Sequence, residues 1–123
     1  KFKASVMASM KVNKNDVSRW GIYNIKKKID KDNFIINNVV EKPSIKTSPS
    51  NNAVIGRYIL PKTIFSKLKS LKPGKSGEFH ITDAIQALIE DDNQFIGHNF
   101  SGKYLDCGTM KGYIKSTLEI SKQ

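Results

Sequence analysis

Cysteine, histidine and arginine are all scarce in this chain of 123 residues. Cys107 is the only cysteine, so no disulfide can form within the chain, which is typical of a reducing compartment such as the cytoplasm. His80 and His98 are the only histidines, which excludes a zinc site of the Cys/His type. No base lies near Cys107 in the sequence to make it a thiolate, so we expect a buried and inert thiol.

Long apolar runs are also missing. No stretch approaches the about 18 residues that a membrane helix requires, so no membrane partner is expected. The length and the hydrophobic fraction of 38% predict one compact domain over residues 1–123. No secretory signal pattern opens the chain. The chain starts without an initiator Met, inside what reads as the approach to a strand, and we therefore expect a piece of a longer protein.

The charge is strongly positive, at +10, but its distribution argues against nucleic acid as the partner. Only Arg19 and Arg57 are arginines, and arginine is the residue best suited to reading bases and phosphates. The lysines are spread along the chain, with one tight run over residues 26–28. We expect a solvated basic surface. A basic nucleic-acid module remains an alternative, which salt-dependent binding to an oligonucleotide would favour.

Patterning predicts strands in the first part of the chain and helices in the second. The expected strands cover residues 4–10, 20–25, 34–40 and 53–60, with a helical turn over 13–17, capped by Asn15 or Asp16, and a charged turn over 26–33. Helices are expected to begin at Pro61, Thr82 and Thr109, and a hairpin to join residues 94–100 with 103–105. The pattern predicts a basic α+β domain, with a mixed sheet and flanking helices.

The stretch from residue 39 to residue 60 is the most informative. An acid and a base, Glu41 and Lys42, follow a short apolar pair. The run over 53–60 is almost wholly apolar, as in a strand buried on both faces, and is interrupted by Gly56. Glycine inside a strand often marks a close approach to the backbone, and Gly21 invites the same interpretation. The stretch is either a hairpin with a surface ion pair or the floor of a site for a small polar ligand.

Two other features could carry chemistry. Residues 74–76 resemble the end of a phosphate-binding loop, but the leading glycine would fall at Lys69, so we expect a plain surface loop. Asp106 is expected to end a strand over residues 104–106, just before Gly108. It could cap a turn or hold Mg²⁺ together with substrate phosphates. No second carboxylate for such an ion is obvious in the sequence.

Four motifs occur in a fixed order along the chain: Glu41-Lys42-Pro43, residues 49–60, residues 72–85, and residues 104–108 followed by Gly112-Tyr113. Together they closely resemble the carboxyl-terminal half of the bacterial UTP–glucose-1-phosphate uridylyltransferases. The resemblance covers essentially the whole chain. It implies an α/β fold in which these residues form the C-terminal part of a Rossmann-like nucleotide-diphospho-sugar transferase.

The resemblance also implies a sugar site. Glu41 is similar to the acid that binds sugar hydroxyls, and Lys42 to the catalytic lysine whose positive charge holds the sugar phosphate. Gly21 matches the glycine whose backbone meets the sugar, although Trp20 stands before it where the family commonly has Tyr. Val54 and Tyr58 match positions that line the sugar pocket. The implied ligands are glucose 1-phosphate and UDP-glucose.

Asp106 matches one of two aspartates that hold Mg²⁺ in this family. The implied reaction is in-line attack of glucose 1-phosphate on the α-phosphorus of UTP, which depends on positioning and charge neutralisation. We expect Glu41, Lys42 and Asp106 to converge on one cavity. The glycine-rich nucleotide loop, the uridine-binding residues and the other aspartate are absent from this sequence.

This absence leads to three expectations. The chain alone is expected to lack uridylyltransferase activity. The strand edges and helix faces that the missing half would cover are expected to pair with a separate amino-terminal half or with a second copy, giving homo-oligomers. The alternative is a non-catalytic assembly or binding module that has kept the fold and lost the reaction.

Overall fold

The structure is a computed structural model that describes residues 4–73, 77 and 79–122. The predicted loop at residues 74–76 lies outside this range. The strands and helices follow in the order β1 Ser5–Lys11, η1 Lys14–Arg19, β2 Gly21–Lys28, β3 Asn33–Glu41, β4 Asn52–Ile59, α1 Ile64–Ser70, α2 Ile81–Glu90, β5 Phe95–Asn99 and α3 Met110–Ile120.

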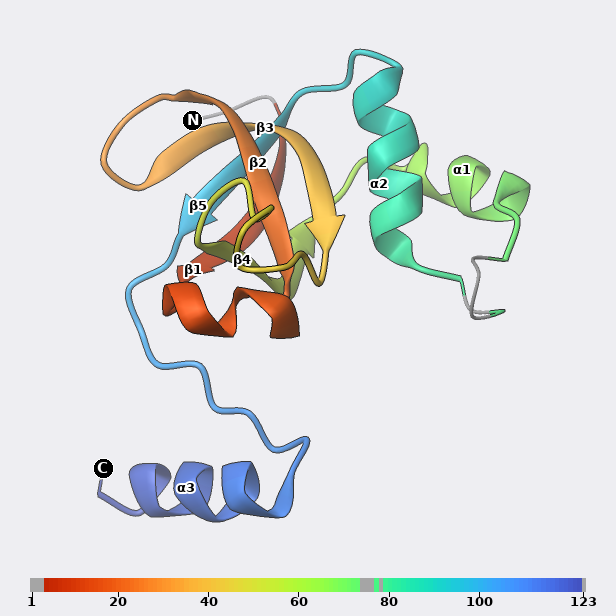
Figure 1. Ribbon diagram of the computed structural model, residues 1–123. Coiled ribbons are helices and arrows are strands. Elements are labelled where there is room, and N and C mark those ends of the chain that lie inside the picture. The colour runs from red at the N-terminus through yellow and green to blue at the C-terminus, as the bar shows by residue number, and fades with distance from the viewer. Residues whose placement is uncertain (1–3, 74–76, 78, 123) are drawn as a thin grey trace.

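The strands form a closed barrel in the order β1-β4-β2-β3-β5 (Figure 1). β1 and β5 run parallel and complete the ring, whereas the other neighbours are antiparallel. β4 and β2 meet at one residue pair, Ile22 with Ala53, so this is the weakest seam. The predicted mixed sheet with helices is confirmed, and its closure into a barrel is a feature that the sequence pattern did not indicate.

The barrel interior is filled by side chains from alternate strand positions. The hydroxyl of Tyr23 donates a hydrogen bond to the carbonyl of Ala8 at 3.0 Å, which satisfies the polar end of a fully buried ring. Residues of α1 and α2 join the same apolar cluster, whose buried members are Met7, Tyr23, Phe34, Ile36, Ile64, Ala84, Ile85, Leu88 and Phe95. The helices therefore extend the barrel core instead of forming a second one.

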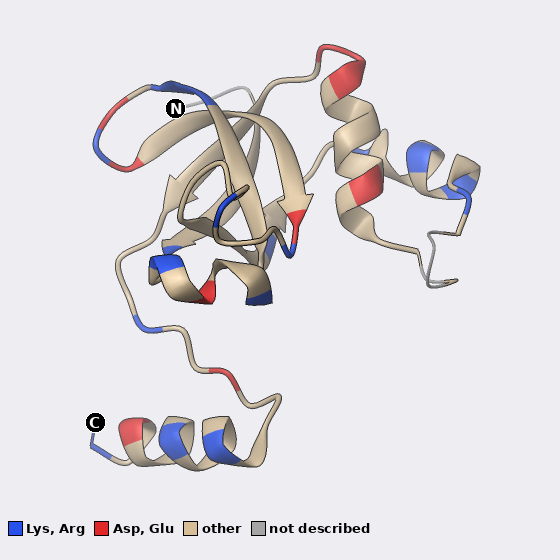
Figure 2. Cartoon of the chain, viewed as in Figure 1, with Lys and Arg blue, Asp and Glu red and all other residues tan. Residues whose placement is uncertain are grey.

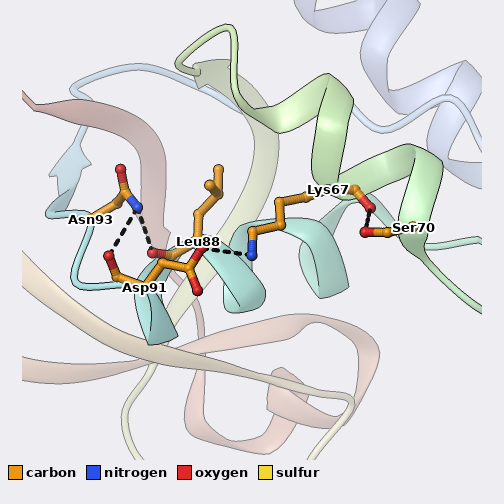
Figure 3. Close-up of polar contacts among 5 residues, drawn as sticks. All are labelled: Lys67, Ser70, Leu88, Asp91 and Asn93. Atoms are coloured by element: carbon orange, nitrogen blue, oxygen red, sulfur yellow. Dashed lines mark hydrogen bonds and ion pairs between the residues drawn. The ribbon is translucent and has the colours of Figure 1, made fainter.

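α1 and α2 pack against each other beside the barrel (Figure 1). Figure 3 shows the contacts at the end of α2. The Lys67 ammonium of α1 lies 2.6 Å from a carboxylate oxygen of Asp91, and the Asn93 amide donates to the Leu88 carbonyl at 2.9 Å. An ion pair this exposed stabilises the fold only slightly. The buried residues of α2, Ala84, Ile85 and Leu88, contribute more because they exclude water.

α3 lies apart from the barrel at the end of an extended segment (Figure 1). Only Ser116 on this helix is buried. Its large apolar side chains are more than half exposed, namely Met110, Tyr113, Ile114, Leu118 and Ile120. As predicted, Thr109 caps the helix, and its hydroxyl accepts a hydrogen bond from the backbone N–H of Gly112 at 3.0 Å.

The predicted hairpin over residues 94–105 is wrong. β5 ends at Asn99, and the structure assigns no strand to residues 100–109. The reason is that β5 already has β1 on one side and β3 on the other, which leaves no free edge for a returning strand. Asp106 therefore does not end a strand.

β4 is not buried on both faces. Arg57 is exposed, and the side chain of Ile59 is 70% exposed, because the outer face of this antiparallel part of the barrel meets solvent. Met7 pairs with Tyr58 and Ser9 with Val54, so the ladder is irregular around Gly56. Gly56 has φ +70° and open space where a Cβ would lie, so glycine is favoured there by backbone conformation and not by a close approach.

Three smaller predictions were also wrong. Cys107 is exposed, because it lies in the extended segment and not in a core. α2 begins at Ile81 after His80, so Thr82 lies within the helix and does not cap it. The η1 turn is capped by Asn13, whose Oδ1 accepts from the backbone of Asn15.

Within the described ranges, no helix combines the length and apolar character needed to cross a membrane.

Gly97 allows the closest packing inside the barrel. A Cβ at this position would lie 2.1 Å from a ring carbon of Phe34. We expect Gly97→Ala to lower the free energy of unfolding by about 1–3 kcal/mol, because the ring has to shift within a packed core. Urea denaturation measures this. The cost should shrink in a Phe34→Leu background, and wild-type stability of Gly97→Ala would contradict the packing described.

Candidate functional site

Gly21 and Glu41 face each other at one end of the barrel, where β2 begins and β3 ends. A Cβ on Gly21 would lie 2.9 Å from Oε2 of Glu41, 3.3 Å from Val39 and 3.4 Å from Val54. A side chain at position 21 would thus push into the carboxylate. The expected close approach to Gly21 is confirmed, and three of the predicted site residues lie together.

Tyr58 belongs to the same group. Burial, and then the negative charge of Glu41, raise the pKa of the Tyr58 hydroxyl above its usual value of 10.0. Burial, and then Tyr58, likewise raise the pKa of Tyr23 well above its usual range. The Tyr58 hydroxyl therefore stays neutral at physiological pH and can donate a hydrogen bond near the carboxylate.

Lys42 marks the point where the chain leaves the barrel. Its backbone has φ +44°, a conformation that is uncommon outside glycine, and its N–H donates to the carbonyl of Trp20 at 2.9 Å. The next residue, Pro43, is buried. The backbone is thus held in place while the Lys42 side chain is exposed, next to the acidic residue at the end of β3 (Figure 2).

Asp106 is held by the start of α3. Its Oδ1 accepts from the backbone N–H of Gly108 at 3.0 Å, and its carbonyl oxygen accepts from the Ser116 hydroxyl at 3.4 Å. A Cβ on Gly112 would lie 2.4 Å from that carbonyl oxygen, so glycine is required for the helix to come this close. Two residues earlier, the ring of Tyr104 meets Trp20 edge-on at 5.2 Å between centroids.

The predicted convergence on one cavity is not seen in the part of the chain that the structure describes. Asp106 lines a hollow of about 680 Å³ whose walls include neither Glu41 nor Lys42. The charged residues around that hollow are mostly basic: Arg19, Lys103, Lys111 and Lys115 accompany Asp106 and Glu119. The contact between Trp20 and Tyr104 is the link between the two sets of residues.

A metal ion would find too few ligands here. Among the described residues, no group of three or more His, Cys, Asp or Glu is placed to hold one. Glu119 forms an ion pair with Lys103, which leaves Asp106 as the available carboxylate of that hollow. Asp106 can supply one oxygen ligand, as Mg²⁺ often takes from a protein, but the remaining ligands have to come from elsewhere.

Sequence reasoning missed two members of the group around Glu41. Val39 forms part of the wall over Gly21, and Tyr23 lies behind Tyr58. Val39 precedes Glu41 by two positions in β3, so period-two alternation could have placed it on the same face. No local signal indicates Tyr23, because its proximity to Tyr58 depends on how β2 and β4 curve around the barrel.

Comparison with known proteins identifies relatives over almost the whole chain. The nucleotidyl transferase family matches residues 2–123. A UTP–glucose-1-phosphate uridylyltransferase of Pseudomonas aeruginosa is 39% identical over 116 residues, which is 94% of this chain and 41% of that protein. A Staphylococcus saprophyticus protein of the same name is 36% identical over 95% of this chain and 40% of its own length.

Solved structures agree. An apo UDP-glucose pyrophosphorylase superposes with a TM-score of 0.90 at 38% identity, over 98% of this chain and 43% of that one. A UDP-glucose pyrophosphorylase complexed with UDP-glucose gives a TM-score of 0.88 at 38% identity, over 100% of this chain and 46% of that one. The chain thus spans less than half the length of these relatives.

The proximity of Glu41 to Tyr58 can be tested by titration. Removing the negative charge of Glu41 in Glu41→Gln should lower the pKa of Tyr58, because the carboxylate no longer repels the Tyr58 phenolate. Tyrosine-labelled carbon NMR across alkaline pH measures this. The raised folded pKa also means that neutral Tyr58 stabilises the fold fully below pH 10, and that this stabilisation is lost as the pH rises through the folded pKa. Glu90→Gln is the control, and an unchanged Tyr58 pKa in Glu41→Gln would contradict the contact.

Proposed function

This chain belongs to the nucleotidyl transferase family, and we propose that it is the sugar-phosphate-binding part of a UTP–glucose-1-phosphate uridylyltransferase. The reaction proposed for the whole enzyme joins UTP and glucose 1-phosphate to give UDP-glucose and pyrophosphate. The observation that carries the proposal is the glycine facing a carboxylate at the barrel end, Gly21 opposite Glu41, with Lys42 next in the chain.

The chemistry of these residues suits a phosphorylated sugar. The Glu41 carboxylate accepts hydrogen bonds from sugar hydroxyls, and the missing side chain at Gly21 leaves room for that carboxylate to lie against the backbone. Tyr58, kept neutral by burial and by Glu41, is an additional donor. The exposed ammonium of Lys42 binds phosphate oxygens as a point charge. These residues bind and orient the sugar phosphate for in-line attack, while Lys42 offsets charge that develops on phosphorus.

The rest of the reaction requires residues beyond this chain. Asp106 would hold Mg²⁺ together with a second carboxylate and phosphate oxygens, and the ion would supply positive charge against the phosphates. The nucleotide would be bound by the other part of the enzyme, since the relatives are more than twice as long. We place the protein in the cytoplasm, where a nucleotide-sugar enzyme with one exposed thiol fits. By itself the chain would not catalyse the uridylyltransferase reaction.

Binding of UDP-glucose tests the proposed site. We expect calorimetry to show weak binding to the chain, and Lys42→Ala to weaken it about tenfold or more, because a charge-assisted hydrogen bond to phosphate is lost. Lys46→Ala, at an exposed lysine outside the site, is the matched control and should leave the affinity unchanged. Equal affinities for wild type and Lys42→Ala would exclude Lys42 from the site.

A second candidate function, a non-catalytic assembly module, is favoured by the apolar surface of α3. Five large apolar side chains on this helix are more than half exposed: Met110, Tyr113, Ile114, Leu118 and Ile120. An apolar surface of this kind usually marks an interface. In the proposed enzyme this surface would meet the remaining part of the fold, and in an assembly module it would meet another copy of the chain.

The chain on its own should therefore self-associate. We expect light scattering at micromolar concentration to detect dimers or larger species, because association removes the α3 apolar side chains from water. Leu118→Glu should shift the distribution toward monomer. Lys115→Glu introduces a carboxylate at another exposed position of α3, changes the net charge more, and should still have a smaller effect because no apolar side chain is lost. A wild-type monomer throughout this range would be the contrary result.

A further inference from the structure

The end of the barrel away from Glu41 is polar and open. Strand directions bring the carboxyl ends of β1, β2 and β5 to this mouth, together with the amino ends of β3 and β4. A hollow of about 330 Å³ lies here, and every strand contributes to its lining, with Lys11, Lys28, Asn33, Asn52 and Asn99 in the order β1, β2, β3, β4 and β5. We refer to it as the barrel mouth. Its volume is at the lower end of the about 300–1,000 Å³ typical of ligand pockets.

Polar atoms without partners lie beneath this mouth. The Ser9 hydroxyl oxygen and the Oδ1 atoms of Asn52 and Asn99 are buried and have no hydrogen bond to any described residue. Ser9 pairs with Asn99 in the parallel ladder, so two of these groups are neighbours, and Asn52 is only 6% exposed. Burying such groups without partners costs free energy. A ligand with hydroxyl groups would supply the missing hydrogen bonds, and rotation of an amide can present its NH₂ group instead.

The rim of the barrel mouth is positively charged. Lys11, Lys28 and Lys31 line it, and none of them forms an ion pair with another residue that the structure describes. Asp30 also lines the hollow, but its Oδ1 accepts hydrogen bonds from the backbone N–H of Asp32 and Asn33, both at 2.9 Å. Lys28, Asp30 and Lys31 lie together on the β2–β3 hairpin, where Figure 2 shows basic and acidic positions side by side. With three ammonium groups against the one carboxylate of Asp30, the described rim has a net positive charge, which favours an anion and disfavours a metal cation.

This mouth is separate from the Glu41 site. Gly21 begins β2 and Glu41 ends β3, whereas Lys28 ends β2 and Asn33 begins β3. At the usual rise per strand residue, Lys28 and Asn33 lie about 20 Å along the ladder from Gly21 and Glu41. Asn52 lies closer to the Glu41 site, because its neighbour Ala53 pairs with Ile22. One sugar phosphate at Glu41 could not also reach Lys28 and Lys31, so a ligand held by these lysines would be a second molecule. The hollow is also too small to hold a nucleic-acid strand.

We propose that the barrel mouth binds a small phosphorylated polyol. The phosphate group lies among Lys11, Lys28 and Lys31, and the hydroxyl groups reach the unpaired oxygens of Asn52 and Asn99. Phosphate alone would satisfy the lysines but leave those oxygens without donors. A phosphate ester that carries hydroxyls therefore binds more tightly than inorganic phosphate. This inference stands whether or not the Glu41 site binds a sugar phosphate.

Titration with glycerol 2-phosphate, followed by ¹H–¹⁵N NMR of the 123-residue chain in phosphate-free buffer, tests the proposal. We expect saturable shifts of the Asn52 and Asn99 side-chain amides, and weaker shifts with inorganic phosphate. The double variant Lys28→Ala/Lys31→Ala should weaken binding about tenfold or more, since charge-assisted hydrogen bonds are lost. Asn99→Ala should reduce the preference for glycerol 2-phosphate over phosphate. Lys46→Ala and Lys42→Ala should leave the response of these amides unchanged.

Three results would overturn the proposal. The first is no saturable shift of the Asn52 and Asn99 amides at millimolar glycerol 2-phosphate. The second is a loss of binding in Lys46→Ala as large as in the double variant, because that would indicate general attraction to a basic protein. The third is a response that disappears in Lys42→Ala and survives in Lys28→Ala/Lys31→Ala, which would assign the ligand to the Glu41 end of the barrel.

Discussion

The pairing of β1 with two partners is the interaction on which the rest of the structure depends. β1 hydrogen-bonds to β4 along one edge and to β5, in parallel, along the other. Without it, β4 would meet the sheet only through one residue pair with β2, and β5 only through β3. Closure by β1 encloses the apolar interior and gives the barrel two distinct ends. The two candidate sites lie at these ends.

At the end of the barrel where β2 begins, the absence of a side chain at Gly21 determines where the Glu41 carboxylate lies. The missing side chain of Gly21 makes room for the Glu41 carboxylate, and Tyr58 stays neutral near it. An exposed glutamate such as Glu41 would not be distinctive alone, since exposed glutamates are common on protein surfaces. Its value comes from the barrel register, which sets the glycine opposite the acid. The same register positions Lys42, whose backbone is tied to Trp20.

Local sequence signals predicted the elements well where one segment decides its own structure. The strands of the first half, the apolar face of α2 and the Thr109 cap all follow from alternation, helical spacing or a capping residue. The signals failed where contacts with a distant segment of the chain determine the local structure. The hairpin after β5 was wrong because β1 and β3 already occupy both edges of β5. Gly56 and the exposed outer face of β4 likewise depend on how the barrel curves.

The site shows the same division. Glu41 and Lys42 stand next to each other in the chain, and their chemistry could be recognised there. That Glu41 and Val54 both lie against Gly21 is a property of strand register, and Tyr23 was missed altogether. Asp106 was recognised as a candidate ligand, but its predicted strand and shared cavity were wrong, since the extended segment after β5 carries it to a different hollow.

The parallel β1–β5 pair has a consequence for biosynthesis. Strands that lie side by side in the barrel are separated in the chain by most of its length, from residue 11 to residue 95. At a translation rate of about 5–20 residues per second, the first strand waits several seconds for its last neighbour. During that interval the edge of β1 that faces β5 is unpaired, and the apolar interior of the barrel is not yet enclosed. A nascent chain of this topology is thus a natural client for chaperones that shield apolar segments at the ribosome.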